Sequence, residues 1–187
     1  MELIEAIYGR RAVREFTTQP VPRPLLHELV QAAVQAPSAM NAQLWSFAFF
    51  QGAERLRDYS DRAKAHFLAV FPPGRDPHAM KHDLLNDPKF NIFYGAGTLV
   101  VVYAKPGGQF ASVDCSLAAE NLMLAAYGMG LGTCPVGFAQ PWFDVTEVKL
   151  ELGIPTDYTA VLPIAIGYPA KTTAPAGRKE PEIIGAD

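Results

Sequence analysis

Apolar side chains recur three or four positions apart along much of the chain, which is the spacing of one buried face of an α-helix. The stretch at about 114–127 is apolar almost all round, so we expect it to lie centrally in the core or in a subunit interface. Residues 144–147 resemble a capping box that opens a further helix, which we expect to close at Gly153. The pattern predicts helices over residues 1–9, 24–36, 56–70 and about 114–127, besides the one that opens at 144–147.

Three other stretches predict strands. Residues 45–50 are dense in aromatic side chains, which favours a buried strand. Residues 99–104 are apolar on both faces, so we expect them at the centre of a covered sheet, and residues 158–168 form a last long strand. Neither an internal repeat nor a long linker divides the chain, so we predict a single domain over residues 1–187.

The charge balance excludes two classes of partner. The chain has 16 Lys+Arg against 19 Asp+Glu and a formal net charge of −3, which is too little positive charge to hold nucleic acid or anionic lipid by bulk charge. No run reaches the roughly 18 apolar residues that span a bilayer, and Met1–Glu5 is acidic where a signal peptide is basic. We therefore expect a cytoplasmic protein with no nucleic-acid and no membrane partner.

Several familiar motifs are absent or occur in the wrong setting. His78 and His82 could share a helix face as metal ligands, but no glutamate follows the first histidine, so no metal site is expected. The glycines of 128–132 follow a helix, whereas a dinucleotide-binding loop follows a strand. Cys115 and Cys134 lack the spacing of a zinc or redox site and are expected to be core residues. The nucleophile and P-loop motifs of hydrolases and nucleotidases are missing.

Two polar clusters remain, and each follows an apolar helix. The first holds Arg10, Arg11 and Arg14, whose guanidinium groups are planar, permanently charged forks suited to phosphate, although such clusters are more often solvated surface. The second is the loop 38–43, whose amide side chains can match the donor and acceptor edge of a heterocycle. Together they suggest a flavin or a nucleotide, and they do not choose between the two.

The residues at this point resemble the FMN-dependent nitroreductases, and the resemblance covers nearly the whole chain in the right order. The motifs that carry it are the run Arg10–Phe16 with its proline turn, the loop Pro37–Trp45, the long helix with its Gly-Leu-Gly end, the turn Pro135–Phe138, and the run Ile166–Pro169 with Arg178. The resemblance implies an α+β fold with a mixed β-sheet covered by helices, and a homodimer with two FMN sites at the subunit interface.

The resemblance also implies roles for individual residues. Arg10 and Arg178 would hold the FMN phosphate, and Arg14 would lie near the pyrimidine side of the isoalloxazine. The loop 38–43 would reach ribityl or ring groups, and the turn after Cys134 would face the ring through its backbone. The implied cofactor-binding set is Arg10, Arg11, Arg14, Ser38, Asn41, Gln43, Pro135, Val136, Gly137 and Arg178, with no catalytic side chain because the flavin carries the chemistry.

The sequence departs from the family pattern at several positions. Ala12 stands where the family has serine, and Leu44 stands where it has proline. Residues 136–138 lack the acidic residue that the family often has there. Lys89 and Asn91 are candidates for a family asparagine contact that precedes the strand at 99–104.

The leading functional hypothesis is an oxidoreductase that transfers hydride from NADH or NADPH to FMN and reduces nitroaromatic, quinone or related small-molecule acceptors by a ping-pong mechanism. One alternative is a flavin-binding carrier or sensor without turnover. Another is a family branch that uses reduced flavin with oxygen, for instance to fragment the flavin itself. The sequence does not choose between NADH and NADPH.

Overall fold

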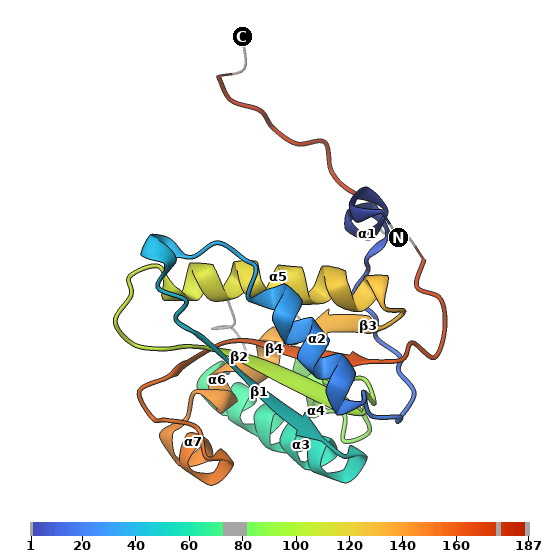
Figure 1. Ribbon diagram of the computed structural model, residues 1–187. Helices are drawn as coiled ribbons and strands as arrows, with labels where there is room; N and C mark the ends of the chain where they lie inside the picture. Colours follow the sequence, from blue (N-terminus) through green and yellow to red (C-terminus); the bar gives the residue numbers. More distant parts are fainter. Residues whose placement is uncertain (1, 73–81, 175–176, 186–187) are drawn as a thin grey trace.

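The computed structural model describes residues 2–72, 82–174 and 177–185, and its centre is a four-stranded sheet (Figure 1). The strand order is β1-β2-β4-β3, and every neighbouring pair is antiparallel. Among the described residues, parallel pairing occurs at a single isolated bridge, between Ala12 and Thr133. The predicted α+β fold is confirmed, but the sheet is antiparallel and not mixed, because each of its strand pairs is antiparallel and the bridge at Ala12 lies outside the strands. The strands are β1 (Trp45–Gln51), β2 (Thr98–Ala104), β3 (Gly132–Pro135) and β4 (Thr159–Gly167).

Helices cover both faces of this sheet (Figure 1). The long helix α5 and the shorter α2 lie on one face, while α3 with α6 and α7 lies on the other. The small helix α1 packs near the C-terminal end of α5. The bounds are α1 (Leu3–Gly9), α2 (Arg23–Ala33), α3 (Ala53–Val70), α4 (His82–Asn86), α5 (Ala111–Gly128), α6 (Gln140–Phe143) and α7 (Thr146–Leu152), with the short 3₁₀ turns η1 (Ala39–Asn41) and η2 (Gly137–Ala139).

The strand β2 divides the interior into two cores because all seven of its residues are buried. Successive side chains of a strand point to opposite faces. Val100 and Val102 therefore pack under α2 and α5, whereas Leu99 and Val101 pack on the α3 side. This double burial is what the run of apolar residues predicted for a central strand.

Helix α5 confirms the expectation of a central helix. Its sheet-facing side carries small residues, among them Cys115, Ala118 and Ala126, which are completely buried. Its outward side carries Phe110, at the helix start, with Val113 and Leu117, all of which are exposed. Both cysteines of the chain are buried and free, as expected, and burial raises the pKa of the Cys115 thiol to about 11. The helix is thus apolar toward the core and toward solvent alike.

Some helix ends differ from the prediction. The predicted capping box at 144–147 is wrong, because the Asp144 carboxylate instead accepts a hydrogen bond from the Ala160 N–H (3.1 Å) and pairs with Lys149. The expected closure of that helix at Gly153 is confirmed, with Gly153 in the left-handed region at φ 71°. The helix predicted over 24–36 ends at Ala33.

Three elements escaped the sequence pattern. The strand β3 has four residues and the helices α4 and α6 have five and four, so none is long enough to show a period. His78 lies outside the described residues, and His82 begins α4. Within the described ranges no group of three or more metal-ligating side chains occurs, and no helix there is long and apolar enough to cross a membrane.

Candidate functional site

The arginines of the N-terminal cluster lie on an extended segment that runs beside β3. We call residues 10–14 the basic segment. The Val13 N–H donates to the Thr133 carbonyl oxygen (2.9 Å), and the Val13 side chain is buried. A Cβ atom at Gly132 would lie 2.6 Å from Val13 Cγ2, so this close approach requires glycine. The backbone of the basic segment is therefore fixed against the sheet edge.

The three arginines have different surroundings. Arg10 Nε lies 3.3 Å from Glu120 Oε1 on α5. Arg11 Nη1 donates to the carbonyl oxygens of Tyr8 (2.6 Å) and Arg10 (2.7 Å), where it neutralises the C-terminal end of α1. Arg14 is exposed. One arginine is thus tethered to the long helix, one caps a helix end, and one faces solvent.

A cavity of about 510 Å³ opens beside Arg10 and Arg11, and the loop 130–133 and residues 169–173 complete its wall. Three buried polar atoms in this wall have no hydrogen-bond partner within the described part of the chain: Arg10 Nε, Arg11 Nε and Thr133 Oγ1. Buried polar groups are almost always paired. Arg10 Nε still lies within ion-pair distance of Glu120, whereas Arg11 Nε and Thr133 Oγ1 have neither contact among the described residues. Two guanidinium groups and a hydroxyl at one cavity fit an anionic ligand with several oxygen atoms, such as a phosphate.

Arg14 lies next to this cavity, on a second hollow that residues 171–174 also line. Its guanidinium is close enough to Tyr94 and Cys134 for its charge to act on both. Burial raises the pKa of the Cys134 thiol, and the positive charge of Arg14 opposes that rise. Nearby, Lys171 forms an ion pair with Glu15. The two hollows share residues 171–173 in their walls, and both lie along the basic segment.

The second predicted cluster is a strained surface loop. We call residues 38–43 the amide loop. The Ser38 hydroxyl accepts a hydrogen bond from the Gln43 N–H (3.1 Å), and the Gln43 side-chain amide donates to Asn41 Oδ1 (2.9 Å). Met40, Asn41 and Gln43 all have left-handed backbone angles, with φ between 52° and 55°. Non-glycine residues in that region are uncommon, and they concentrate at functional sites.

The two clusters contact α5 at different points along its length (Figure 1). The amide loop contacts the first turn of the helix, because the Ala39 N–H donates to the Asp114 carboxylate. The basic segment contacts its second half, through Glu120, while Gly9 packs on Tyr127. Asp114 and Glu120 are six residues apart, about 9 Å along the helix axis at 1.5 Å per residue. The amide loop lines neither of the two hollows along the basic segment.

The remaining residues of the predicted set are spread over two places. Pro135 and Gly137 are exposed at the end of β3, but the Val136 side chain is buried and its N–H donates to the Pro163 carbonyl oxygen (2.8 Å). Arg178 is exposed on the C-terminal tail, which extends away from the domain beyond α1 (Figure 1). It does not line the cavity beside Arg10. A single chain therefore does not bring Arg178 to that cavity.

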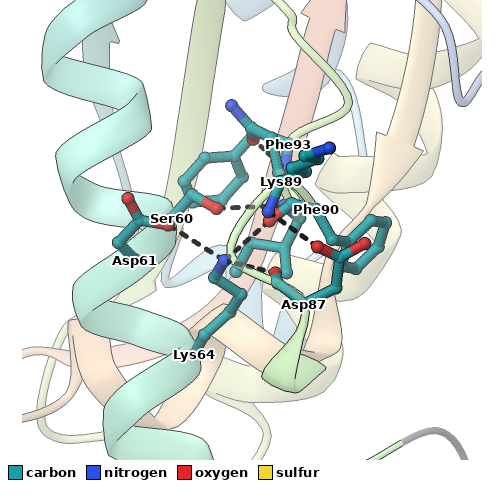
Figure 2. A network of polar contacts seen from close by, with 9 residues as sticks. Ser60, Asp61, Lys64, Asp87, Lys89, Phe90 and Phe93 are labelled. Carbon is teal, nitrogen blue, oxygen red and sulfur yellow. Dashed lines mark hydrogen bonds and ion pairs between the residues drawn. The ribbon is translucent and has the colours of Figure 1, made fainter. Parts of the chain in front are cut away.

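A polar network that the sequence did not reveal holds the segment 87–93 against α3 (Figure 2). The buried Lys64 ammonium donates to the carbonyl oxygens of Phe90 (2.7 Å) and Asp87 (3.3 Å), and it pairs with Asp61 (2.9 Å). One turn earlier on α3, the Ser60 hydroxyl accepts the Ile92 N–H (3.0 Å). The available signal was the presence of Ser60 and Lys64 on the apolar face of a helix.

Lys89 and Asn91, the two candidates for a flavin contact, lie in this same segment. Lys89 is exposed, and its N–H donates to the Asp87 carboxylate (2.8 Å). Asn91 Oδ1 accepts the Phe93 N–H (2.8 Å), so that oxygen is already used inside the turn. Tyr94 follows directly, in the left-handed region at φ 57°, and reaches Arg14. The segment thus connects α3 to the basic segment through Tyr94.

Comparison with known proteins gives one family. A model described as the nitroreductase family matches residues 7–168. An FMN reductase [NAD(P)H] of Bacillus subtilis is 25% identical, over 98% of this chain and 72% of the relative. A nitrobenzene nitroreductase of Ectopseudomonas oleovorans is 28% identical, over 88% of this chain and 85% of the relative. A crystal structure of a nitroreductase with bound FMN from Bacteroides fragilis aligns with a TM-score of 0.79 at 27% identity, covering 100% of this chain and 97% of that one.

The chain offers a matched pair of variants for testing the network in Figure 2. Lys149 on α7 is as buried as Lys64, and it also binds two carbonyl oxygens, those of Thr156 and Tyr158, and one carboxylate. We expect Lys64→Met and Lys149→Met each to lower the free energy of unfolding by about 1–3 kcal/mol, because buried acceptors lose their donor. Urea titration measures this loss.

Only Lys64→Met should loosen the segment that leads to Tyr94. Hydrogen exchange of the Ile92 and Phe93 amides should accelerate in Lys64→Met and stay unchanged in Lys149→Met. Equal exchange in the two variants would show that Lys64 does not hold this segment.

Proposed function

The chain belongs to the nitroreductase family, and from that premise we propose that it is an FMN-dependent oxidoreductase that takes hydride from NADH or NADPH and passes electrons to nitroaromatic, quinone or related small acceptors in a ping-pong cycle. The bound FMN would supply the hydride and electron chemistry. The side chains of this protein would bind and orient the cofactor, exclude water from one of its faces and place charge beside it.

The observation that carries this proposal is the set of buried polar atoms without a hydrogen bond among the described residues, at the cavity beside the basic segment. Arg10, Arg11 and Thr133 line a hollow of about 510 Å³, which has room and positive charge for a phosphate group. The family serine that would add a hydroxyl donor is Ala12 in this chain. The buried hydroxyl of Thr133, on the strand beside Ala12, can take that place. We therefore assign this cavity to the FMN phosphate.

We assign the isoalloxazine to the region around Arg14, which lies one hollow further along the segment. Reduction adds negative charge near N1 of a flavin. A guanidinium at that position therefore interacts more strongly with the reduced cofactor than with the oxidised one, and such a difference raises the reduction potential. Pro135, Val136 and Gly137 would face the ring from the end of β3, with Gly137 as the open position because no atom lies within 4 Å of its Cβ site. Lys89 and Asn91 remain candidates for a contact from the segment 87–93.

The amide loop would complete the site from a second copy of the chain. Within one chain the loop contacts α5 at Asp114 and the basic segment contacts it at Glu120, and the loop lines neither of the two hollows along the basic segment. The outward stripe of α5, made of Phe110, Val113 and Leu117, is exposed, and so are four apolar side chains of α1. A second copy packed on this surface would bury it. We propose a homodimer in which Ser38, Asn41 and Gln43 of one subunit face the arginines of the other, and in which Arg178 reaches the partner's phosphate site.

We expect the purified protein to be yellow, with FMN as the cofactor that acid releases, because the phosphate cavity has no adjoining dinucleotide-binding loop. With NADH or NADPH and a quinone acceptor, it should consume the reductant steadily and give the parallel double-reciprocal plots of a ping-pong mechanism. Bound FMN without consumption would indicate a carrier or sensor instead. Destruction of the flavin under oxygen would indicate the branch that uses reduced flavin with oxygen, and FAD as the main cofactor would contradict the cofactor assignment.

Light scattering at low micromolar concentration should give twice the chain mass of 20.3 kDa. Leu117→Glu should give a monomer that does not retain FMN, because it puts a charge on the outward stripe of α5. The control is Leu150→Glu on α7, which changes a leucine of even greater exposure on the opposite side of the sheet. Leu150→Glu should remain a dimer and should retain FMN. A monomer that keeps FMN would contradict the placement of the cofactor between subunits.

The two arginine roles can be separated by redox titration and stopped-flow reduction of variants reconstituted with excess FMN. Arg10→Ala should weaken FMN binding and leave the potential of the bound flavin nearly unchanged, since a phosphate keeps its charge on reduction. Arg14→Ala should lower the potential. Because a charge-assisted hydrogen bond contributes roughly 1.5–3 kcal/mol, reduction by NAD(P)H should slow by about tenfold or more. A shift in potential for Arg10→Ala alone would reverse the assignment.

A further inference from the structure

We propose that Asp114 is a positioning residue, which holds the amide loop in the conformation that receives the flavin of the partner subunit. The role rests on the proposed function, because the flavin is the ligand that the loop would meet. Asp114 does not face the basic segment of its own chain. It would therefore act on the cofactor only through the loop.

The Asp114 carboxylate is buried at the first turn of α5, with 5% of the residue exposed. Both of its oxygens accept the Ala39 N–H, at 3.1 Å for Oδ2 and 3.3 Å for Oδ1. Within the described residues no Lys or Arg nitrogen lies within 4.0 Å of it, whereas the buried Lys64 and Lys149 each have a carboxylate partner. A buried charge without a counterion is costly, and it persists where hydrogen bonds compensate it. The amide of the loop supplies that bond here, and the positive end of the α5 dipole favours the charge further.

The loop depends on such polar contacts because it has almost no core of its own. None of the residues of η1 is buried, and Met40 is 99% exposed. Met40, Asn41 and Gln43 hold left-handed angles that cost free energy in any non-glycine residue. A loop that buries no apolar side chain has little to offset this cost. Its geometry therefore depends on hydrogen bonds, both those within the loop and the one that Asp114 supplies from α5.

The consequence of this arrangement is a specific pattern of effects. A residue that acts on the loop alone should change how tightly FMN is bound, but it should hardly change the potential of the flavin that remains bound. Its effect should also depend on the loop side chains being present. If Asn41 no longer contacts the cofactor, a displaced loop has less binding to lose. A merely structural role for Asp114 predicts neither the selectivity nor this dependence.

The test uses the full-length protein and FMN as the probe. Asp114→Asn keeps the size of the side chain and one acceptor oxygen but removes the charge. We expect the FMN dissociation constant to rise at least tenfold and the potential of the bound flavin to stay nearly constant. In an Asn41→Ala background the same substitution should raise the dissociation constant less than threefold further. In the apoprotein, hydrogen exchange of the Ala39 amide should accelerate at least tenfold.

The matched control is Glu54→Gln, which removes an exposed first-turn carboxylate from α3, a helix of the same length as α5, with 18 residues. It should change FMN affinity less than twofold. A second variant tests the same bond from the loop side. Ala39→Pro removes the donated N–H, and the preceding Ser38 is already extended (φ −139°, ψ 148°), as a residue before proline must be. Ala39→Pro should weaken FMN binding at least tenfold, as we expect for Asp114→Asn. It therefore tests the bond independently if Asp114→Asn fails to fold.

Three results would overturn the proposal. The first is unchanged FMN affinity in a folded Asp114→Asn or in Ala39→Pro. The second is a full tenfold effect of Asp114→Asn in the Asn41→Ala background. The third is an Ala39 amide that exchanges equally fast with and without the carboxylate. Failure of the proposed function is a separate outcome, because there the unmodified protein itself would not bind FMN, and the positioning role would then fall with it.

Discussion

The rest of the structure depends on how helix α5 is buried. The helix packs small side chains against β2 and β4, and this close contact forms one of the two cores. The same helix presents apolar side chains outward and carries the two polar clusters at different points along its length. A helix that is apolar on opposite sides cannot be satisfied by one sheet face. Helix α5 thus needs a second covering surface on its outward side, and the same helix keeps the two polar clusters apart.

Polar groups in this protein are buried where a connecting segment must be fixed. Lys64 and Lys149 use their ammonium groups to bind the carbonyl oxygens of a neighbouring turn, and Asp114 uses its carboxylate to bind an amide. In each case a rigid helix supplies the side chain and an irregular segment supplies the backbone. A buried charge is a costly anchor, but it is a directional one, which an apolar contact is not. The segments held in this way are the turn before Tyr94, which contacts Arg14, the turn before β4, and the amide loop.

The main elements could be predicted from the sequence because their apolar patterns extend over many residues. Residues 99–104 are apolar at every position, and only a strand covered on both faces accounts for such a run. The strand β3 and the capping of α7 could not be predicted, because both depend on partners distant in sequence: β3 on Ile164 and its neighbours, and Asp144 on the Ala160 amide. The arginines and the amide loop could be identified from the sequence, because their side chains have the charge and the hydrogen-bonding groups that a cofactor needs. Their separation along α5 could not be found in the same way, since spacing along a chain does not measure distance in the fold.

Placing the two polar clusters at different points of one helix has a thermodynamic consequence. If a binding site takes one half from each of two chains, then ligand binding and chain association are linked equilibria, and each strengthens the other. Cofactor occupancy then depends on the concentration of the protein as well as on that of the cofactor. At high dilution the chains and the flavin would separate together. The cell could thus control the active fraction of this protein through its rate of synthesis alone, with no further regulatory element.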